Sequence, residues 1–217
     1  MKSIIARILD ALFPKNERVQ RLEALNQSEL RSFLPHSPQT PHSWMQSLFE
    51  YRNPNTKEFV WQIKYAGNPI LTKHAGALLA DEIQSHIEER GLYIGSGCVI
   101  VAIPASKLHI KEKGFNQTDA LCKEIQKHIE SDAVAYIPHL LIKTKEAPPQ
   151  VSIHSKEARI KNLVNAFAVE PSLAEKIQNR HVFIIDDVLT TGSTLTEARR
   201  ALIEAGAKSV TGLTLAH

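Results

Sequence analysis

The chain has 217 residues, of which 43% are hydrophobic, so it is long enough for one α/β domain with a real core and too short for two full ones. A formal net charge of +3 is too small to indicate by itself a protein that binds polyanions. The two cysteines, Cys98 and Cys122, form no C-x-x-C pair, which excludes a zinc ribbon and a disulfide framework and fits a reducing cytoplasm.

The first 40 residues are expected to form a helical extension that ends in a linker. Residues 1–13 are apolar at helical spacing, but Arg7 and Asp10 interrupt them, so the segment is too short and too charged for a signal peptide or a membrane span. We expect it to dock on the protein's own core, with an interfacial amphipathic helix as the alternative. The proline-rich stretch from Pro35 to Pro41 is typical of a linker, and the main domain is expected over residues 41–217.

From about residue 45, short apolar runs alternate with amphipathic segments, which indicates βα units and a mostly parallel sheet. A helical stripe of apolar residues runs from Leu71 to Ile87. Cys98–Ile103 is a continuous apolar run of strand length and predicts a buried strand. Another helix is expected over Phe115–Ile129. The two tryptophans, Trp44 and Trp61, are expected to pack in the core or the hood, with a base-stacking platform as the alternative.

The segment Lys143–Lys156 contains two adjacent prolines and no periodicity, so it predicts a long mobile loop, and such loops are usually functional. A short helix from about Lys156 and a brief strand over Ala166–Val169 should follow.

The last third of the chain has the clearest pattern. It divides into a buried strand, a loop, a helix and a final strand, at Val182–Ile185, Asp186–Ser193, Thr194–Ala205 and Ser209–Leu215. Thr194 and Glu197 are spaced as a capping box at the start of the helix. Gly206 directly follows this helix, at the position after a helix end where glycine is the favoured residue.

Two carboxylates followed by a hydroxyl-rich loop give this segment its chemistry. Asp186 and Asp187 come directly after the predicted strand, at the sheet edge where α/β proteins bind ligands. Residues 190–194 lead into a helix N-terminus, where backbone N–H groups favour an anion, and Gly192 lets a phosphate approach the backbone. Carboxylates would repel a bare phosphate, but they suit the vicinal hydroxyls of a ribose 5-phosphate whose phosphate lies in the loop.

Two other interpretations compete with a sugar-phosphate site. The first is an ordinary capped helix after a strand, with two exposed aspartates. The second is a phospho-receiver domain, in which an acid pair ends the first strand of the domain. Only 30 residues follow Asp187, which excludes the receiver domain.

Residues 182–194, VFIIDDVLTTGST, resemble the signature of type I phosphoribosyltransferases that binds 5-phosphoribosyl-1-pyrophosphate (PRPP). The resemblance implies that Asp186 and Asp187 are the catalytic acids and hold the ribose 2′- and 3′-hydroxyls. It also implies Mg²⁺ as cofactor, bound through PRPP and without a direct protein ligand. The residues implied for the 5′-phosphate are Thr190, Thr191, Gly192, Ser193 and Thr194.

Three further segments, Tyr51–Gly67, Val101–Gln117 and Lys143–Phe167, resemble the ComF family of phosphoribosyltransferase-like proteins, which is linked to DNA uptake in competent bacteria. The resemblance runs from about residue 47 to the last residue. It implies the type I phosphoribosyltransferase fold, α/β with a mostly parallel central sheet flanked by helices, and a small hood at about residues 45–70. The family usually begins with a cysteine-rich zinc module, whereas this sequence has no cysteine before Cys98.

The pyrophosphate of PRPP is assigned by the same resemblance to two loops, at Ala105, Ser106, Lys107, Lys113, Gln150 and Arg159. Lys107 and Lys113 stand where arginines are common, and lysine binds phosphate without the bidentate fork of arginine. A solvated charged loop is the alternative for the first of these segments.

The resemblance implies transfer of phosphoribosyl to an unidentified acceptor, with release of pyrophosphate. Thr190 replaces the acid with which many 6-oxopurine salvage enzymes contact the base, which disfavours hypoxanthine or guanine as the acceptor. The alternative is a non-catalytic module that responds to PRPP or a nucleotide and binds single-stranded DNA together with DNA-uptake proteins. We expect a cytoplasmic protein, and the sequence leaves the oligomeric state open, a dimer included.

Overall fold

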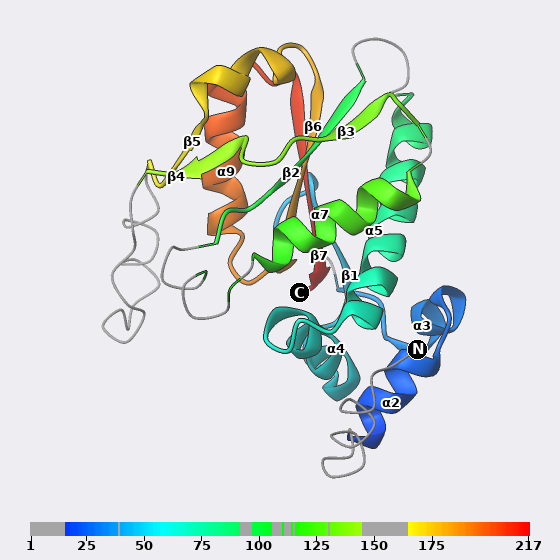
Figure 1. Ribbon diagram of the computed structural model, residues 1–217. Coiled ribbons are helices and arrows are strands. Elements are labelled where there is room, and N and C mark those ends of the chain that lie inside the picture. Colours follow the sequence, from blue (N-terminus) through cyan, green and yellow to red (C-terminus); the bar gives the residue numbers. More distant parts are fainter. Residues whose placement is uncertain are drawn as a thin grey trace.

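The computed structural model describes residues 16–38, 40–91, 97–105, 110, 114, 116–129, 131–144 and 165–217. Its centre is a sheet of five parallel strands in the order β1-β7-β6-β2-β3 (Figure 1). These strands are β1 (Met45–Phe49), β2 (Cys98–Ala102), β3 (Val134–Tyr136), β6 (His181–Val188) and β7 (Ser209–Ala216). The expected mostly parallel sheet is therefore confirmed.

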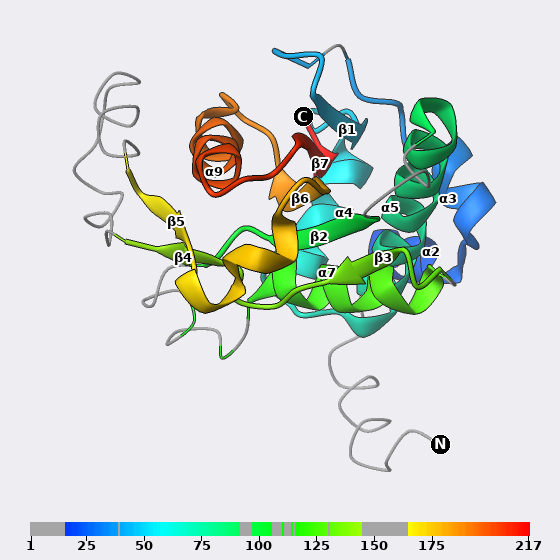
Figure 2. The same cartoon turned by 90° about the horizontal axis from the view of Figure 1, so that it is seen from above.

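Helices cover both faces of the sheet, which gives three layers (Figure 2). On one face lie α4 (Pro54–Lys64), α5 (Pro69–Arg90) and α7 (Gln117–His128). On the other lie α9 (Ser193–Glu204), the 3-10 helix η2 (Pro171–Ile177) and an antiparallel arm of β4 (Leu141–Lys143) and β5 (Phe167–Val169). Within the described ranges, no helix is both long enough and apolar enough to cross a bilayer.

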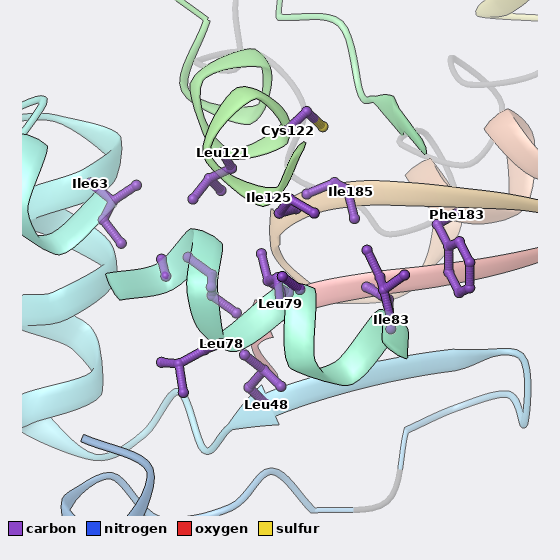
Figure 3. Close-up of a cluster of buried hydrophobic side chains, with 14 of the residues drawn as sticks. Leu48, Ile63, Leu78, Leu79, Ile83, Leu121, Cys122, Ile125, Phe183 and Ile185 are labelled. Carbon is purple, nitrogen blue, oxygen red and sulfur yellow. The ribbon is translucent and has the colours of Figure 1, made fainter. Parts of the chain in front are cut away.

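The apolar side chains form one core on each face of the sheet, and β6 contributes to both. Phe183 and Ile185 point toward α5 and α7, in the cluster shown in Figure 3. Val182 and Ile184 point toward α9. Successive side chains of a strand alternate between the two faces, so the same alternation sends Asp187 toward α7 and Asp186 toward α9.

Two short helices precede the sheet, α2 (Glu17–Ala24) and α3 (Gln27–Phe33). Asn26 caps α3 in a capping box with Glu29. Leu22 and Leu30 are fully buried in the core on the α5 side, so this extension packs against the main domain. The boundary near residue 40 stays a prediction. Of the segment expected to form the hood, β1 joins the edge of the central sheet and α4 follows it.

Three expectations for local structure were wrong. The strand expected to end at Ile185 continues to Val188, because its last residues still pair with β7, and the two aspartates therefore lie within β6. The capping box at Thr194 is not formed: α9 begins at Ser193, and the Glu197 carboxylate pairs instead with Arg200 at 2.7 Å. Trp61 is not in the core, since 50% of its surface is exposed, whereas Trp44 is partly buried against the core on the α9 side.

The end of α9 agrees with the sequence. Gly206 has a φ of +102°, and the N–H groups of Gly206 and Ala207 donate to the carbonyls of Ile203 and Leu202 at 3.0 Å each. These two hydrogen bonds form a Schellman motif, which requires a residue in the left-handed region, and glycine adopts that region without strain. Glycine at this position is therefore explained by the helix end.

Candidate functional site

The carboxyl ends of β2, β6 and β7 meet at one edge of the sheet. Ala102 of β2 is the partner of Ile185, and Asp186 is the partner of Thr214 in β7. The Ile103 N–H donates to the Ile185 carbonyl at 3.0 Å, which holds the start of the next loop beside β6. The acid pair thus lies at the ligand-binding edge typical of parallel α/β sheets.

Asp187 is buried, with 3% of its surface exposed, and two other elements hold its carboxylate. Lys64, the last residue of α4, places its Nζ 2.9 Å from Oδ2 and 3.1 Å from Oδ1. Gln117, at the start of α7, donates from Nε2 to Oδ2 at 3.1 Å. Burial alone would lower the pKa of Lys64, but the Asp187 carboxylate raises it, and the net direction is upward. The lysine therefore stays charged beside the carboxylate.

Asp186 is on the opposite face of β6 and is only partly buried. Its Oδ1 accepts the Asp187 backbone N–H at 2.8 Å. Burial, followed by the charge of Asp187, raises the pKa of Asp186 to about 7, against the opposing charges of Lys64 and Lys143. Near neutral pH the carboxyl of Asp186 is therefore easily protonated.

The loop after β6 exposes the start of α9. Thr190 and Thr191 are exposed, and the Thr191 and Ser193 hydroxyls lie 2.9 Å apart. Gly192, the N-cap residue, has a φ of +75°, and a Cβ there would lie 2.9 Å from Cε of Met45. Gly192 has no side chain to cap this helix, and among the described residues the Thr191 hydroxyl accepts the Ser193 N–H at 3.4 Å, so the positive end of the helix dipole faces the hydroxyls of the loop. This arrangement suits a phosphate group.

The structure describes only one of the residues predicted to bind pyrophosphate, Ala105. Ala105 lies three residues after the end of β2, at the edge shared with the acid pair. Ser106, Lys107, Lys113, Gln150 and Arg159 lie outside the described residues, and so does most of the predicted mobile loop. Their role stays a prediction.

Lys64 and Gln117 contact the acid pair but were not identified as site residues from the sequence. Each belongs to a segment that carries the family resemblance. The sequence therefore indicated the two segments, but it did not indicate that these side chains contact Asp187. Lys64 directly follows the buried Ile63, and this position beside the apolar stripe of α4 is the sequence feature that could have indicated an inward-pointing lysine. A cation at the edge of a buried stripe can point into the molecule as well as into solvent.

Comparison with known proteins decides the family. The model of the phosphoribosyl transferase domain matches residues 132–217, which include the acid pair and the loop. The DNA utilization protein YhgH of Escherichia coli K12 is 30% identical over 176 residues, 79% of this chain and 72% of that protein. The chain belongs to the ComF family of phosphoribosyltransferase-like proteins. The resemblance found in the sequence is thereby confirmed.

A second relative of this ComF protein is competence protein ComFC of Streptococcus pneumoniae strain R6, 27% identical over 164 residues, 76% of this chain and 64% of that one. Among solved structures, a hypoxanthine phosphoribosyltransferase from Staphylococcus aureus is similar at 15% identity and a TM-score of 0.37, over 65% of this chain and 62% of that chain. With its parallel sheet, flanking helices and matched domain, the chain has the type I phosphoribosyltransferase fold.

Proposed function

We propose that this ComF protein binds PRPP at the carboxyl edge of β6 and transfers the phosphoribosyl group to a nitrogen acceptor. One observation carries the proposal: a single stretch of chain presents the acid pair, then the glycine turn at Gly192, then the open N-terminus of α9. Carboxylates for ribose hydroxyls and a helix end for the 5′-phosphate match the two ends of a ribose 5-phosphate. Membership of the ComF family and the matched domain support this assignment.

In the proposed reaction, the acceptor nitrogen attacks C1 of the ribose while the bond from C1 to the pyrophosphate oxygen breaks. The leaving group takes the bonding electrons as pyrophosphate, and the proton of the attacking nitrogen passes to solvent. Asp186 and Asp187 would fix the ribose, and residues 190–194 would fix the 5′-phosphate, so that C1 is held for attack. The protein supplies position and electrostatics, and no side chain has to form a covalent intermediate.

Mg²⁺ fits this site as part of the ligand. Burial first, and then the charge of Asp187, raise the pKa of Asp186, and a ligand carrying its own divalent cation would offset the second of these effects. When bound with PRPP, the ion neutralises charge on the pyrophosphate. Lys64 already neutralises Asp187, so the proposal requires no direct protein ligand for the metal.

Calorimetric titration of PRPP in the presence of Mg²⁺ tests the binding site. We expect saturable binding by the intact chain and none by the Asp186→Asn/Asp187→Asn variant, whose fold is checked by circular dichroism. Asp132→Asn removes an exposed carboxylate elsewhere and should bind PRPP as the parent does. Failure of the intact chain to bind PRPP would overturn the proposal.

A second candidate is a non-catalytic PRPP-responsive module that binds single-stranded DNA with DNA-uptake proteins. It is favoured by the names of the relatives, a DNA utilization protein and a competence protein. Release of pyrophosphate from PRPP on addition of an acceptor would establish the transferase. PRPP binding without release, together with DNA binding that weakens steeply with salt, would favour the module.

A further inference from the structure

A hollow with a mainly apolar wall lies between α5 and α7, beside the turn that joins α4 to α5. Its volume is about 660 Å³. One water molecule takes up about 30 Å³, so the hollow can receive several apolar side chains. Residues of three helices form part of its wall: Ile63, Pro69, Thr72 and Ala120. An apolar surface of this kind marks a contact with another element or molecule.

Residues 1–13, which lie outside the described part of the chain, carry a matching apolar stripe in their sequence. The spacing i, i+3, i+4, i+7 of one helix face is followed by Ile5, Ile8, Leu9 and Leu12. At the same period Arg7 and Asp10 fall on the opposite face. A helix of this length is marginal in water by itself, so it requires a surface for its apolar stripe.

The connection to α2 directs such a helix back along α2. Pro14 disfavours helical backbone at the residue before it, so a helix that precedes it ends there. Asn16 is the N-cap of α2, and its side chain accepts the Arg18 N–H at 3.0 Å. The connection is therefore about as short as the loops of two to five residues that join antiparallel helices in hairpins.

The far end of α2 lies beside the hollow. α2 packs against α4 and α5 (Figure 1). Glu23, in its last turn, accepts a hydrogen bond from Nδ2 of Asn68 at 2.7 Å, and Asn68 caps α5 directly before Pro69. α2 is about 12 Å long and a helix of 13 residues about 20 Å, at 1.5 Å per residue. A helix that turns back before Asn16 is therefore long enough to pass the end of α2 and enter the hollow.

We propose that residues 1–13 form an amphipathic helix that packs into the hollow between α5 and α7 with its apolar stripe inward. The occupant is thus a segment of this chain and not a lipid surface. Helices that lie on anionic membranes have a polar face rich in lysine and arginine. Here Asp10 offsets one of the two cations of the segment, Lys2 and Arg7, which favours the protein's own groove.

The hollow adjoins the acid pair through Gln117. This residue lines the hollow, has 8% of its surface exposed, and donates to Oδ2 of Asp187 at 3.1 Å. Ile63, on the α4 side of the wall, directly precedes Lys64, the other partner of Asp187. A helix packed here holds the ends of α4 and α7 that position this carboxylate. This consequence rests on the proposed function, whereas the packing itself does not.

Hydrogen exchange of the full chain tests the packing. Amides of residues 5–12 should exchange at least about tenfold more slowly in the parent than in the Ile5→Ser/Leu9→Ser variant. Ala120→Glu places a carboxylate in the hollow and should remove the same protection without altering the segment. Ser3→Ala, on the polar face, is the matched control and should keep it. Absence of protection in the parent, or protection that survives Ala120→Glu, would overturn the proposal.

Cross-linking locates the helix independently of its stability. The native Cys98 and Cys122 are buried, so introduced thiols react first. A short bismaleimide should join Leu9→Cys to Lys123→Cys, which lines the hollow, within one molecule. It should not join Leu9→Cys to Lys208→Cys, which is exposed just before β7, at the opposite edge of the sheet from the acid pair. Equal cross-linking of both pairs would contradict a fixed position.

Two further outcomes separate the packing from its rival and from the proposed function. Binding of the parent, but not of Ile5→Ser/Leu9→Ser, to phosphatidylserine vesicles, with no protection in their absence, would overturn the proposal in favour of a membrane helix. The double variant should bind PRPP about two- to tenfold more weakly, and equal affinity would overturn the link through Gln117. If the parent does not bind PRPP, the proposed function fails, and exchange and cross-linking still decide the packing.

Discussion

The two ends of β6 bury ionisable groups in opposite ways. At its start, His181 has 5% of its surface exposed, and its ring packs edge-on against Phe183 at 4.6 Å and beside His86 at 5.7 Å. Burial, with His86 and Arg90 as further causes, lowers the pKa of His181 to about 4, so this histidine is neutral in the folded protein. At the other end Asp187 is as deeply buried, yet its carboxylate is paired with the ammonium of Lys64.

The difference lies in what the neighbouring elements supply. The His181 Nδ1 lies 2.7 Å from the Ser209 hydroxyl, a neutral partner that suits a neutral ring. Asp187 receives the ammonium of Lys64 and the amide of Gln117, from two separate helices. A protein keeps a buried charge at the cost of bringing a counter-charge to it, and a neutral histidine avoids that cost. The charged end of β6 is therefore the end to which we assign a ligand.

Removal of the counter-charge should have the largest effect. Lys64→Met leaves the Asp187 carboxylate buried without a cation, and we expect it to reduce the free energy of unfolding by about 2–4 kcal/mol. Lys64→Met/Asp187→Leu should recover much of this loss, because both charges are then removed. Urea unfolding of the single and double variants measures the coupling.

The exposed pair between Lys123 and Asp119, 2.7 Å apart, provides the control. Lys123→Met should cost under about 1 kcal/mol, since 62% of the lysine side chain is exposed and water screens the pair. If Lys64→Met cost no more than Lys123→Met, the buried charge would not depend on its counter-ion.

Lowering the pH should reduce the free energy of unfolding through His181, at the start of β6. His181 has a lowered pKa when folded, so its contribution to stability is full above its unfolded pKa of 6.5 and is lost as the pH falls through about 4. Between about pH 7 and pH 4, the parent should lose about 2–3 kcal/mol more stability than His181→Phe, which cannot titrate there. Asp186 titrates in both proteins, so its contribution largely cancels. Equal losses in the two proteins would contradict the prediction.

The two edges of the sheet can also be compared through the glycines that flank α9, because both have a positive φ. Gly192 faces the ligand edge, and Gly206 lies at the opposite edge, where a Cβ would come within 2.2 Å of the Gln178 Oε1. Alanine at either position should cost about 1–2 kcal/mol of stability, because both have a positive φ. PRPP affinity should fall about tenfold in Gly192→Ala alone, since its backbone forms the phosphate loop. A similar loss of affinity in Gly206→Ala would show that general destabilisation, and not the loop, is responsible.

The sequence predicted the parts of this architecture that depend on local pattern. The long stripe of α5 and the apolar runs of β2 and β6 are sustained enough to identify, and the acid pair and Gly192 follow β6 directly. The three-residue strands β3 and β4 are too short to show a period, and only their partners in space define them. Lys64 and Gln117 meet Asp187 across 123 and 70 residues, and local pattern cannot report such contacts. Trp61 was expected to pack in the core or the hood because large aromatic residues are usually buried, and the structure shows half of its surface exposed on α4.

The smallest expected effect distinguishes the two carboxylates from each other. Because the pKa of Asp186 is about 7, ribose hydroxyls that donate to its ionised form should release a proton on binding. PRPP affinity should therefore rise with pH and increase up to about tenfold between pH 6 and pH 8. Calorimetry across this range, compared with Asp186→Asn, separates the titration of the protein from that of the phosphates of PRPP. If both proteins have the same slope, the second charge at this edge takes no part in holding the ribose, and Asp187 with its lysine does so alone.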